Sequence, residues 1–256
     1  MIILSPSKGQ DFSPIDRVLP WTLPEFPEQT QQLIATLRQY DLEALASLLA
    51  ISPTLAKRTH DQLKVFALPH TPTNAKQALL AFSGEVFRSM AATAFTPADL
   101  LYAQDQVRIL SGLYGCLRPL DLIQPHRLEM DSKLPPTQEK NLSAFWSKLL
   151  TEHLNQAVRK ETQPVVINLA SNEYTRVINR DRMQALWLDI QFKEEKGDRL
   201  RTVAIFAKRA RGMMARFLLR HRIENSAEMQ QFTGEGYKFS PEVSSGTCWV
   251  FTRPMA

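Results

Sequence analysis

The chain has 256 residues, 44% of them hydrophobic and 22% charged, with 31 basic and 26 acidic side chains. This composition suits a globular protein whose core is large enough to need no disulfide or metal. No stretch approaches the roughly 18 apolar residues of a membrane span, and residues 1–6 lack the pattern of a signal peptide. The two cysteines, Cys116 and Cys248, stand far apart without CxxC spacing, which favours a reducing compartment. We therefore expect a cytoplasmic protein that makes no membrane contact; its oligomeric state stays open.

The first half of the chain shows mainly helical spacing. Residues 1–4 predict a buried strand that leads into a polar loop over residues 5–9. Apolar side chains recur at helical spacing from about residue 27 to residue 49, and further helices are expected at 74–82, 98–110 and 142–160. Thr96-Pro97-Ala98-Asp99 is a helix start signal, because it combines a capping hydroxyl, a first-turn proline and an acid near the positive end of the helix dipole.

The second half is predicted to contain most of the strands. Residues 164–169 form a short apolar run typical of a central strand. Residues 186–193 and 199–205 flank a glycine-containing turn and predict a hairpin, and a last pair is expected at 236–239 and 247–252. These elements predict an α/β fold (mixed α+β), with a mixed sheet surrounded by helices in one domain spanning residues 1–256.

Positive charge is concentrated in one segment. Residues 199–222 hold eight basic side chains and no Asp or Glu, which leaves 23 basic and 26 acidic residues elsewhere. Such a local field is expected of a surface that binds an anionic partner. Seven of the eight are arginines, whose forked guanidinium suits phosphate or carboxylate. The eight are Arg199, Arg201, Lys208, Arg209, Arg211, Arg216, Arg220 and Arg222.

A helix predicted over residues 206–220 carries most of these charges. At roughly 100° per residue, its apolar side chains gather on one side and its basic side chains form two stripes beside them. Gly212 lies between the stripes, where it costs about 1 kcal/mol relative to alanine. We interpret this glycine as a point of close approach between the backbone and a phosphate. The alternative is an ordinary amphipathic helix with a solvated basic face.

Residues 109–121 contain a second candidate for phosphate binding. A helix is predicted to end at Gly112, a tight turn to run from Gly112 to Gly115, and Pro119 to open the next helix. This is the order of a helix-hairpin-helix module, whose backbone N–H groups bind DNA phosphates without reading bases. The alternative is a glycine-terminated helix followed by a structural turn.

Polar side chains after the predicted strands define a candidate pocket. In α/β sheets the carboxyl ends of adjacent strands meet where ligands usually bind. Together with Lys208, Arg211 and Arg216 these side chains would supply carboxylates, phenols and cations, although each alone is more often a cap or a surface residue. They are Ser5, Lys8, Asn168, Ser171, Glu173, Tyr174, Glu235 and Tyr237.

Motifs of the common cofactor and metal sites are missing from the sequence. It contains no GxSxG, GxxxxGK[ST] or GxGxxG, so a hydrolase triad, a P-loop and a dinucleotide fold have no support. Its five histidines show no ligand spacing with cysteine or acidic residues. We therefore expect no cofactor and no metal ion, and direct sequestration of iron has weak support.

Several blocks in fixed order resemble the YaaA family of peroxide-stress proteins. The resemblance covers nearly the whole chain and implies a single-domain fold particular to that family, with a positively charged cleft and a helix-hairpin-helix element. It also implies binding to DNA, including duplex DNA, and protection against peroxide, in part by keeping unincorporated iron low. The blocks are Ile3 to Lys8, Leu110 to Gly115, Leu117 to Asp121, Arg127 to Met130, Asn168 to Tyr174, Lys208-x-x-Arg211-Gly212 with Met214-x-Arg216-Phe217, and Gly234 to Tyr237.

The resemblance carries over Gly112, Gly115, Lys208, Arg211 and Arg216 as functional residues. Cys116 departs from the aliphatic residue expected beside them. An exposed thiol there would be open to oxidation, whereas a buried one is inert.

Two functions compete. The leading hypothesis is a protein that binds double-stranded DNA or another nucleic acid with little base specificity, through phosphate contacts. Its predicted contacts are Gly112, Gly115, Lys208, Arg209, Arg211 and Arg216. The alternative is an enzyme acting on a nucleotide or nucleic-acid base, with Glu173 or Glu235 as acid or base and Tyr174 or Tyr237 as donor. Side chains converging in an enclosed cleft would favour the enzyme, and an open groove would favour the binding protein.

Overall fold

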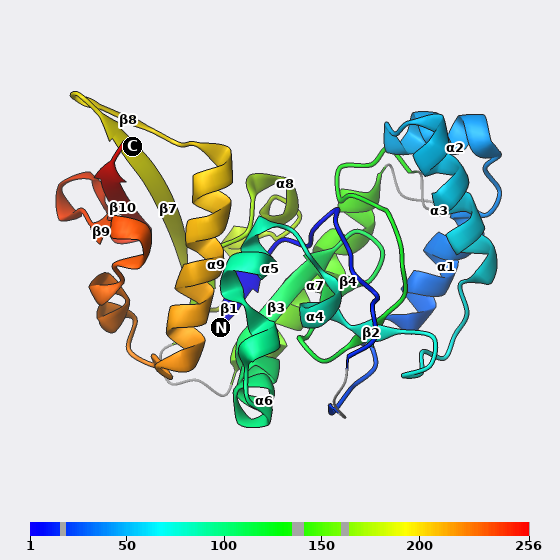
Figure 1. Ribbon diagram of the computed structural model, residues 1–256, viewed down its shortest axis with the longest axis horizontal. Helices are drawn as coiled ribbons and strands as arrows, with labels where there is room; N and C mark the ends of the chain where they lie inside the picture. Colours follow the sequence, from blue (N-terminus) through cyan, green and yellow to red (C-terminus); the bar gives the residue numbers. More distant parts are fainter. Residues whose placement is uncertain (16–18, 135–140, 160–163, 256) are drawn as a thin grey trace.

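One mixed sheet of eight strands organises the chain (Figure 1). The computed structural model describes residues 1–15, 19–134, 141–159 and 164–255. The strand order is β4-β3-β1-β6-β7-β10-β9, with β8 paired to β7. The strands are β1 (Ile2–Leu4), β3 (Val107–Ser111), β4 (Gly115–Leu117), β6 (Val165–Asn168), β7 (Leu186–Lys196), β8 (Arg199–Arg201), β9 (Lys238–Phe239) and β10 (Cys248–Pro254).

The middle strands of this sheet are parallel. β1 pairs in parallel with β3 and β6, β6 with β7, and β7 with β10, whereas β4, β8 and β9 are antiparallel to their neighbours. Ile3 and Leu4 are fully buried, as expected for a parallel strand covered on both faces. The chain runs from β1 to β3 on one side and later to β6 on the other. The carboxyl end of β1 is therefore a topological switch point, the usual place for a ligand in an open α/β sheet.

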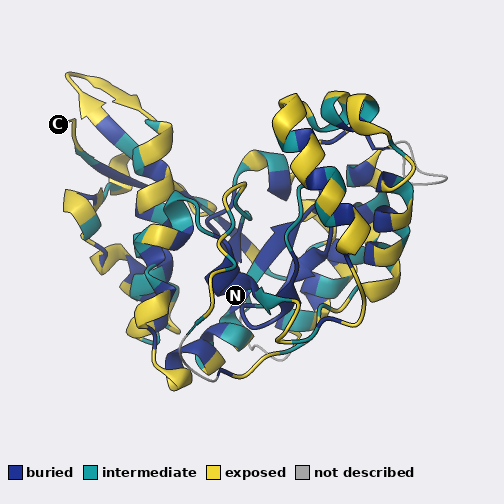
Figure 2. Cartoon of the chain, turned by 45° about the vertical axis from the view of Figure 1, so that its right-hand side comes forward, coloured by how far each residue is buried: buried dark blue, intermediate teal, exposed yellow. Residues whose placement is uncertain are grey.

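Helices surround the sheet, and most of their exposed residues lie on the outside of the molecule (Figure 2). A two-stranded ribbon of β2 (Lys76–Gln77) and β5 (Leu122–Ile123) lies apart from the main sheet. Within the described ranges, no helix is long and apolar enough to cross a bilayer. The helices are α1 (Pro27–Leu37), α2 (Leu42–Leu49), α3 (Pro53–Val65), α4 (Ala78–Ala81), α5 (Glu85–Met90), α6 (Pro97–Gln106), α7 (Leu142–Val158), α8 (Asn172–Thr175) and α9 (Ala204–Arg220).

The mixed α/β fold and most of the predicted elements are confirmed. Helices α7 and α9 and strands β1 and β6 lie where the sequence predicts them. Thr96 accepts a hydrogen bond from the Asp99 amide at 3.1 Å, and the Asp99 carboxylate accepts one from the Thr96 amide at 3.0 Å, which completes a capping box at α6. β7 and β8 form the predicted hairpin, in which Gly197 takes a φ of 56°.

Three helix predictions are wrong in extent. Residues 27–49 form two helices, because the Asp41 carboxylate accepts a hydrogen bond from the Ala44 amide and starts α2. The helix predicted over 98–110 ends at Gln106, and the chain continues as β3 because Val107, Ile109 and their neighbours pair with β1. The helix predicted over 74–82 is reduced to α4, since β2 pairs with β5.

Helix α9 packs closely against α5 and also touches α6 and β7 (Figure 1). A methyl group at Gly212 would overlap the Val86 carbonyl oxygen and the Ser89 hydroxyl of α5. Gly212 is therefore required for contact between the two helices. The interpretation of Gly212 as a phosphate contact is wrong, because α5 occupies the space beside it.

We predict that Gly212→Ala lowers the free energy of unfolding by about 1–3 kcal/mol, because the added methyl group overpacks the contact between α5 and α9. Urea denaturation followed by circular dichroism measures this change. Gly246→Ala is the control, since nothing lies within 4 Å of the added carbon, and it should change stability by less than about 0.5 kcal/mol. Equal stabilities for the two variants would contradict the packing role.

Candidate functional site

Side chains from two loops meet at the carboxyl end of β1, as the switch point predicts. The Ser171 amide, which follows β6, donates to the Ser5 hydroxyl at 2.8 Å, and the two serine hydroxyls lie 3.1 Å apart. The Ser7 hydroxyl accepts from the Gly84 amide at 2.9 Å, which joins this loop to the start of α5. These bonds hold residues 5–7 and residue 171 together at the carboxyl end of β1.

Glu173 lies in an unfavourable environment beside this loop. Burial raises the pKa of Glu173, and the carboxylates of Asp131 and Glu129 raise it further, while Lys8 and Arg176 lower it. One of its carboxylate oxygens, Oε1, is buried without a hydrogen-bond partner among the described residues. A carboxylate without partners is costly to bury, so this group favours the protonated form more than an ordinary glutamate does.

Tyr174 completes this group, which we call the β1-edge cluster: Ser5, Lys8, Glu129, Asp131, Ser171, Glu173 and Tyr174. The Tyr174 hydroxyl donates to Glu129 Oε2 at 2.8 Å. Burial raises the pKa of Tyr174, and the Glu129 carboxylate beside it acts in the same direction. Tyr174 is therefore a neutral hydrogen-bond donor at neutral pH. The cluster combines two kinds of proton donor and one cation, which is the chemistry needed for acid–base work.

Three of the predicted pocket residues are directed elsewhere. Asn168 donates to Asp189 Oδ1 at 2.7 Å. Tyr237 donates to Glu194 and Glu235 pairs with Arg253 at 3.0 Å, so both belong to a group of ion pairs around β10. Asn168, Tyr237 and Glu235 are thus held by neighbours that the sequence alone does not bring near them.

Three arginines on α9 or just after it are paired with the protein's own carboxylates. Arg209 pairs with Glu235 at 3.0 Å. At the other end of the helix, Arg220 and Arg222 both pair with Asp99, at 3.4 and 3.0 Å. These three arginines join α9 to η4 (Gly234–Gly236) and to the start of α6, and they have little free charge to offer an anionic partner.

Lys208, Arg211 and Arg216 differ from the paired arginines. None of the three forms an ion pair within the described part of the chain. Burial lowers the pKa of Arg211, and its Nε is enclosed without a hydrogen-bond partner among the described residues. An arginine remains charged in proteins, so Arg211 carries a largely buried charge that lacks a carboxylate. An anion bound there would remove this cost.

The helix-hairpin-helix predicted at residues 109–121 is not found. Gly112 lies in the turn between β3 and β4, Gly115 begins β4, and both are buried. The backbone of Leu128 and Glu129 covers Gly112, and the ring of Trp146 covers Gly115. Their amides are therefore closed to a phosphate, and both glycines serve the packing of the sheet.

The rest of this segment is also structural. Pro119 does not open a helix, because Arg118 pairs with the fully buried Asp121 at 2.9 Å and closes a turn before β5. Burial raises the pKa of the Cys116 thiol to about 12. Since the thiolate is the reactive form, Cys116 is inert, as expected for a buried cysteine.

A helical hairpin occurs elsewhere, at α2 and α3, where the sequence analysis predicted no such module. Ala50 ends α2 in the left-handed conformation, with a φ of 49°. Ser52 then starts α3 by accepting a hydrogen bond from the Leu55 amide at 3.3 Å, and Pro53 takes the first helical position. Only three residues separate the two helices, which pack against each other.

The start of α3 is exposed and carries basic side chains. Thr54, Lys57 and Arg58 are exposed, and a shallow groove on this helix continues past Asp61. Helix starts leave backbone N–H groups unpaired and carry partial positive charge. The hairpin therefore presents an exposed, basic helix start, although it lacks the Gly-x-x-Gly turn that the sequence analysis predicted at Gly112 and Gly115.

The sequence did contain a signal for this hairpin. Ser52-Pro53 is the same kind of helix start as Thr96-Pro97. Helix α3 was missed because its buried positions are Ala56, Thr59 and Leu63, a weakly apolar set. Within the described ranges, no group of three or more His, Cys, Asp or Glu side chains is placed to hold a metal ion.

We predict that Glu173→Gln stabilises the protein at neutral pH. Because the folded-state pKa is raised, Glu173 favours folding in its protonated form, and this contribution is lost as the pH rises through the folded-state pKa. The advantage of the variant should therefore be small near pH 4 and larger at pH 7, as measured by urea denaturation at several pH values. Glu28→Gln, on the exposed start of α1, is the control. A Glu173→Gln variant less stable than the native protein at pH 7 would contradict the free-energy cost assigned to burying this carboxylate.

Comparison with known proteins gives one consistent family. A family model described as peroxide stress protein YaaA matches residues 1–243. A UPF0246 protein of Acaryochloris marina is 42% identical over 99% of both chains, and one of Magnetococcus marinus is 42% identical over 100% of both. A UPF0246 protein of Cellvibrio japonicus is 40% identical over 98% of this chain and 97% of its own. The chain therefore belongs to the YaaA family of peroxide stress proteins, also called UPF0246.

Proposed function

We propose that this protein binds double-stranded DNA through phosphate contacts, with little base specificity, and that this binding serves protection against peroxide damage. The observation that carries the proposal is the division of charge on α9. Arg209, Arg220 and Arg222 are paired with carboxylates, whereas Lys208, Arg211 and Arg216 are not. A surface that served only solubility would have no reason to keep a guanidinium largely buried and unpaired.

The family resemblance supports the same three residues. Lys208, Arg211 and Arg216 belong to the sequence block that resembles other family members, and they are the cations of α9 that have no ion pair among the described residues. Lys208 and Arg211 are three positions apart, so they lie on neighbouring parts of one helix face. Backbone phosphates suit them because guanidinium and ammonium groups bind phosphate without reading a base.

The α2–α3 hairpin provides a second proposed contact. Its exposed helix start carries Lys57 and Arg58, and helix starts are a common place for a phosphate to bind. In Figure 1 this hairpin lies far from α9, toward the other end of the long axis. The two regions would therefore contact separate phosphates of a duplex, and their contributions can be measured separately.

We predict that Lys208→Ala combined with Arg216→Ala weakens binding to a 30-base-pair duplex about tenfold at low salt. The slope of log affinity against log salt should fall by about 1.8, because each lost phosphate contact accounts for about 0.9. Fluorescence anisotropy between 50 and 200 mM salt measures both quantities. Arg209→Ala combined with Arg220→Ala is the matched control, since it removes equal charge from the same helix but from paired positions.

A similar loss in both double variants would contradict the role of the unpaired cations, because it would show a response to net charge alone. Lys57→Ala combined with Arg58→Ala tests the hairpin in the same assay, with Lys148→Ala on the exposed surface of α7 as its control. An unchanged affinity in the hairpin variant would restrict the interface to α9.

A second candidate function is an enzyme acting on a nucleotide or nucleic-acid base at the β1-edge cluster. The raised pKa of Glu173 favours it, because an acid shifted by burial and by neighbouring carboxylates is typical of proton-transfer sites. Incubation with mononucleotides and with short DNA, followed by mass spectrometry, tests for a product. Turnover that Glu173→Gln abolishes, while DNA affinity is retained, would favour the enzyme.

A further inference from the structure

Strand β7 has a short length of open backbone between its partners β6 and β8. Along its other edge, β10 pairs with β7 without interruption from Asp189 to Glu195. On this edge β6 reaches only to Asp189, and β8 begins opposite Glu194. Within the described ranges, residues 190–193 therefore have a paired strand on one side and none on the other, although β7 is an inner strand of the sheet. We call this stretch the β7 open edge.

The alternation of a strand determines which backbone groups face the β7 open edge. The Leu186 amide donates to the Pro164 carbonyl at 2.9 Å, on the β6 side. The Asp189 amide donates to the Thr247 carbonyl at 2.9 Å, on the β10 side. Because the backbone groups of successive residues point to opposite edges, β7 residues of even number face β6 and β8.

Three backbone groups are consequently left open: the carbonyl of Ile190, and the amide and carbonyl of Phe192. The register places the last bond to β6 between the Ile190 amide and the Asn168 carbonyl, and Glu194 then pairs with Arg201 of β8. The three groups have no hydrogen-bond partner in the described part of the chain. Ile190 and Phe192 are only 3% and 2% exposed. Buried backbone groups are nearly always paired, so these three are candidates for contact with a ligand.

Asn168 is the residue that ends β6 at this point. In a longer β6, the Ala170 amide would donate to the Ile190 carbonyl. Instead it donates to the side-chain oxygen of Asn168 at 2.9 Å, and Asn168 Nδ2 is held by Asp189 at 2.7 Å. The asparagine side chain thus competes with the ladder for this amide. The chain continues to Ser171 of the β1-edge cluster, so the β7 open edge begins at the carboxyl end of β6, where open α/β sheets usually bind ligands.

The length of the β7 open edge favours a small molecule over a peptide strand. From Asp189 to Glu194, β7 advances about 16 Å at roughly 3.3 Å per residue, and β6 and β8 close this length at its two ends. An added strand would need an edge that continues beyond it, which neither end provides. Gln191, which projects from one face of β7 between the open groups, is exposed, so solvent reaches this face of the strand.

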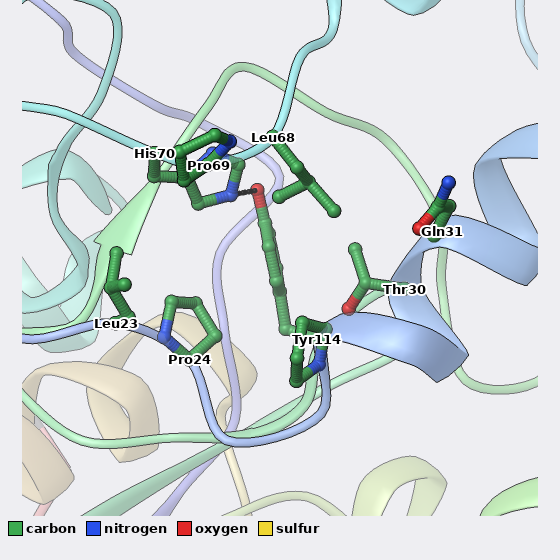
Figure 3. A pocket seen from close by; sticks show the side chains of 9 residues that line it. Leu23, Pro24, Thr30, Gln31, Leu68, Pro69, His70 and Tyr114 are labelled. Atoms are coloured by element: carbon green, nitrogen blue, oxygen red, sulfur yellow. Dashed lines mark hydrogen bonds between the residues drawn. The ribbon is translucent and has the colours of Figure 1, made fainter.

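The cavity between α1 and the segment after α3 offers no comparable set of groups (Figure 3). Its lining is mostly apolar, and its histidine and tyrosine bond to each other, with His70 Nε2 3.1 Å from the Tyr114 hydroxyl. Small probes could nevertheless enter its volume of about 370 Å³. A test of the β7 open edge therefore needs a control for this cavity.

We propose that the β7 open edge binds a small molecule that carries a hydrogen-bond donor next to an acceptor. The ligand's donor pairs with the Ile190 carbonyl and its acceptor with the Phe192 amide, two groups that are neighbours on one edge of an extended strand. Nucleobases and carboxamides share this kind of edge. Backbone groups placed in this way give orientation and specificity in small-molecule sites. For a nucleobase, the site supplies the recognition that the second candidate function needs and rests on that function; the binding itself requires neither turnover nor DNA.

Two matched pairs of probes test this edge: 1-methylcytosine with its N4,N4-dimethyl derivative, and benzamide with N,N-dimethylbenzamide. The parent of each pair has an N–H donor beside an acceptor, and the derivative has lost the donor. In a titration followed by nuclear magnetic resonance, we expect a parent probe to move the Phe192 amide proton downfield and to slow its hydrogen exchange. The parent should bind about fivefold more tightly than its derivative, the ratio expected for one net hydrogen bond.

The two pairs distinguish the sources of the ligand. A response to 1-methylcytosine alone identifies a nucleobase site, a response to benzamide alone identifies a carboxamide site, and a response to both confirms the shared edge. An unmoved Phe192 amide with both parents, or equal affinity for parent and derivative in both pairs, overturns the proposal. Because the titrations contain no DNA, their failure leaves the proposed DNA contacts of α9 untouched.

Replacement of single backbone amides by esters locates the effect. Phe192→phenyllactic acid removes the N–H of this residue, keeps its side chain, and should weaken binding of the parent probe about fivefold. Phe206→phenyllactic acid is the control, since its amide lies in the first turn of α9, outside the bonds of the helix, and it should bind as the native protein does. Equal affinities of the two esters would refute the assignment.

Leu68→Trp is the control for the cavity of Figure 3, because it fills the space beside His70 and Tyr114. This variant should leave the response of the Phe192 amide unchanged. Loss of probe binding in Leu68→Trp would place the probes in the cavity and overturn the proposal. If the ester at residue 192 fails to fold, the Phe192 amide resonance with the matched probes still decides the outcome in the native protein.

Discussion

Helix α9 lies so close to α5 that no side chain fits at Gly212, and much of the molecule depends on this contact. Val86 and Ser89 of α5 occupy the space that a side chain at Gly212 would need. The contact fixes both the rotation and the height of α9, because a turn of the helix in either direction would bring a larger residue against α5. It therefore determines which basic side chains meet carboxylates and which do not. The start of α5 is in turn held to the carboxyl end of β1 by the bond between Ser7 and Gly84.

The fixed position of α9 divides its basic residues into paired and unpaired ones among the described residues. Arg209 meets Glu235, and Arg220 and Arg222 meet Asp99, so these three attach the helix to its neighbours. Ion pairs at such partly exposed positions contribute little stability individually, and here their number matters less than their effect on free charge. Lys208, Arg211 and Arg216 remain for an external anion. The local excess of arginine in the sequence is thus a mixture of structural and candidate binding residues.

The β1-edge cluster holds a polar group at a cost that the fold does not offset. One oxygen of the Glu173 carboxylate is buried without a hydrogen-bond donor among the described residues. Buried polar groups are nearly always paired in native proteins, so unpaired ones are candidates for contact with a ligand.

The local sequence determined the mixed α/β fold, most helices and strands, and the capping box at Thr96, because these depend on periodicity and on contacts a few residues apart. It also identified the loops of Ser5, Ser171 and Glu173, since the carboxyl ends of parallel strands meet by topology. Tertiary structure alone decided which groups the glycines and the arginines contact. Gly112, Gly115 and Gly212 were interpreted as phosphate contacts but are covered by Leu128, Trp146 and α5. The physical reason is that a glycine or an arginine has the same local pattern whether its neighbour is a phosphate or another part of the chain. Only the packing of distant segments places Asp99 or Glu235 beside an arginine, or leaves Arg211 without a partner.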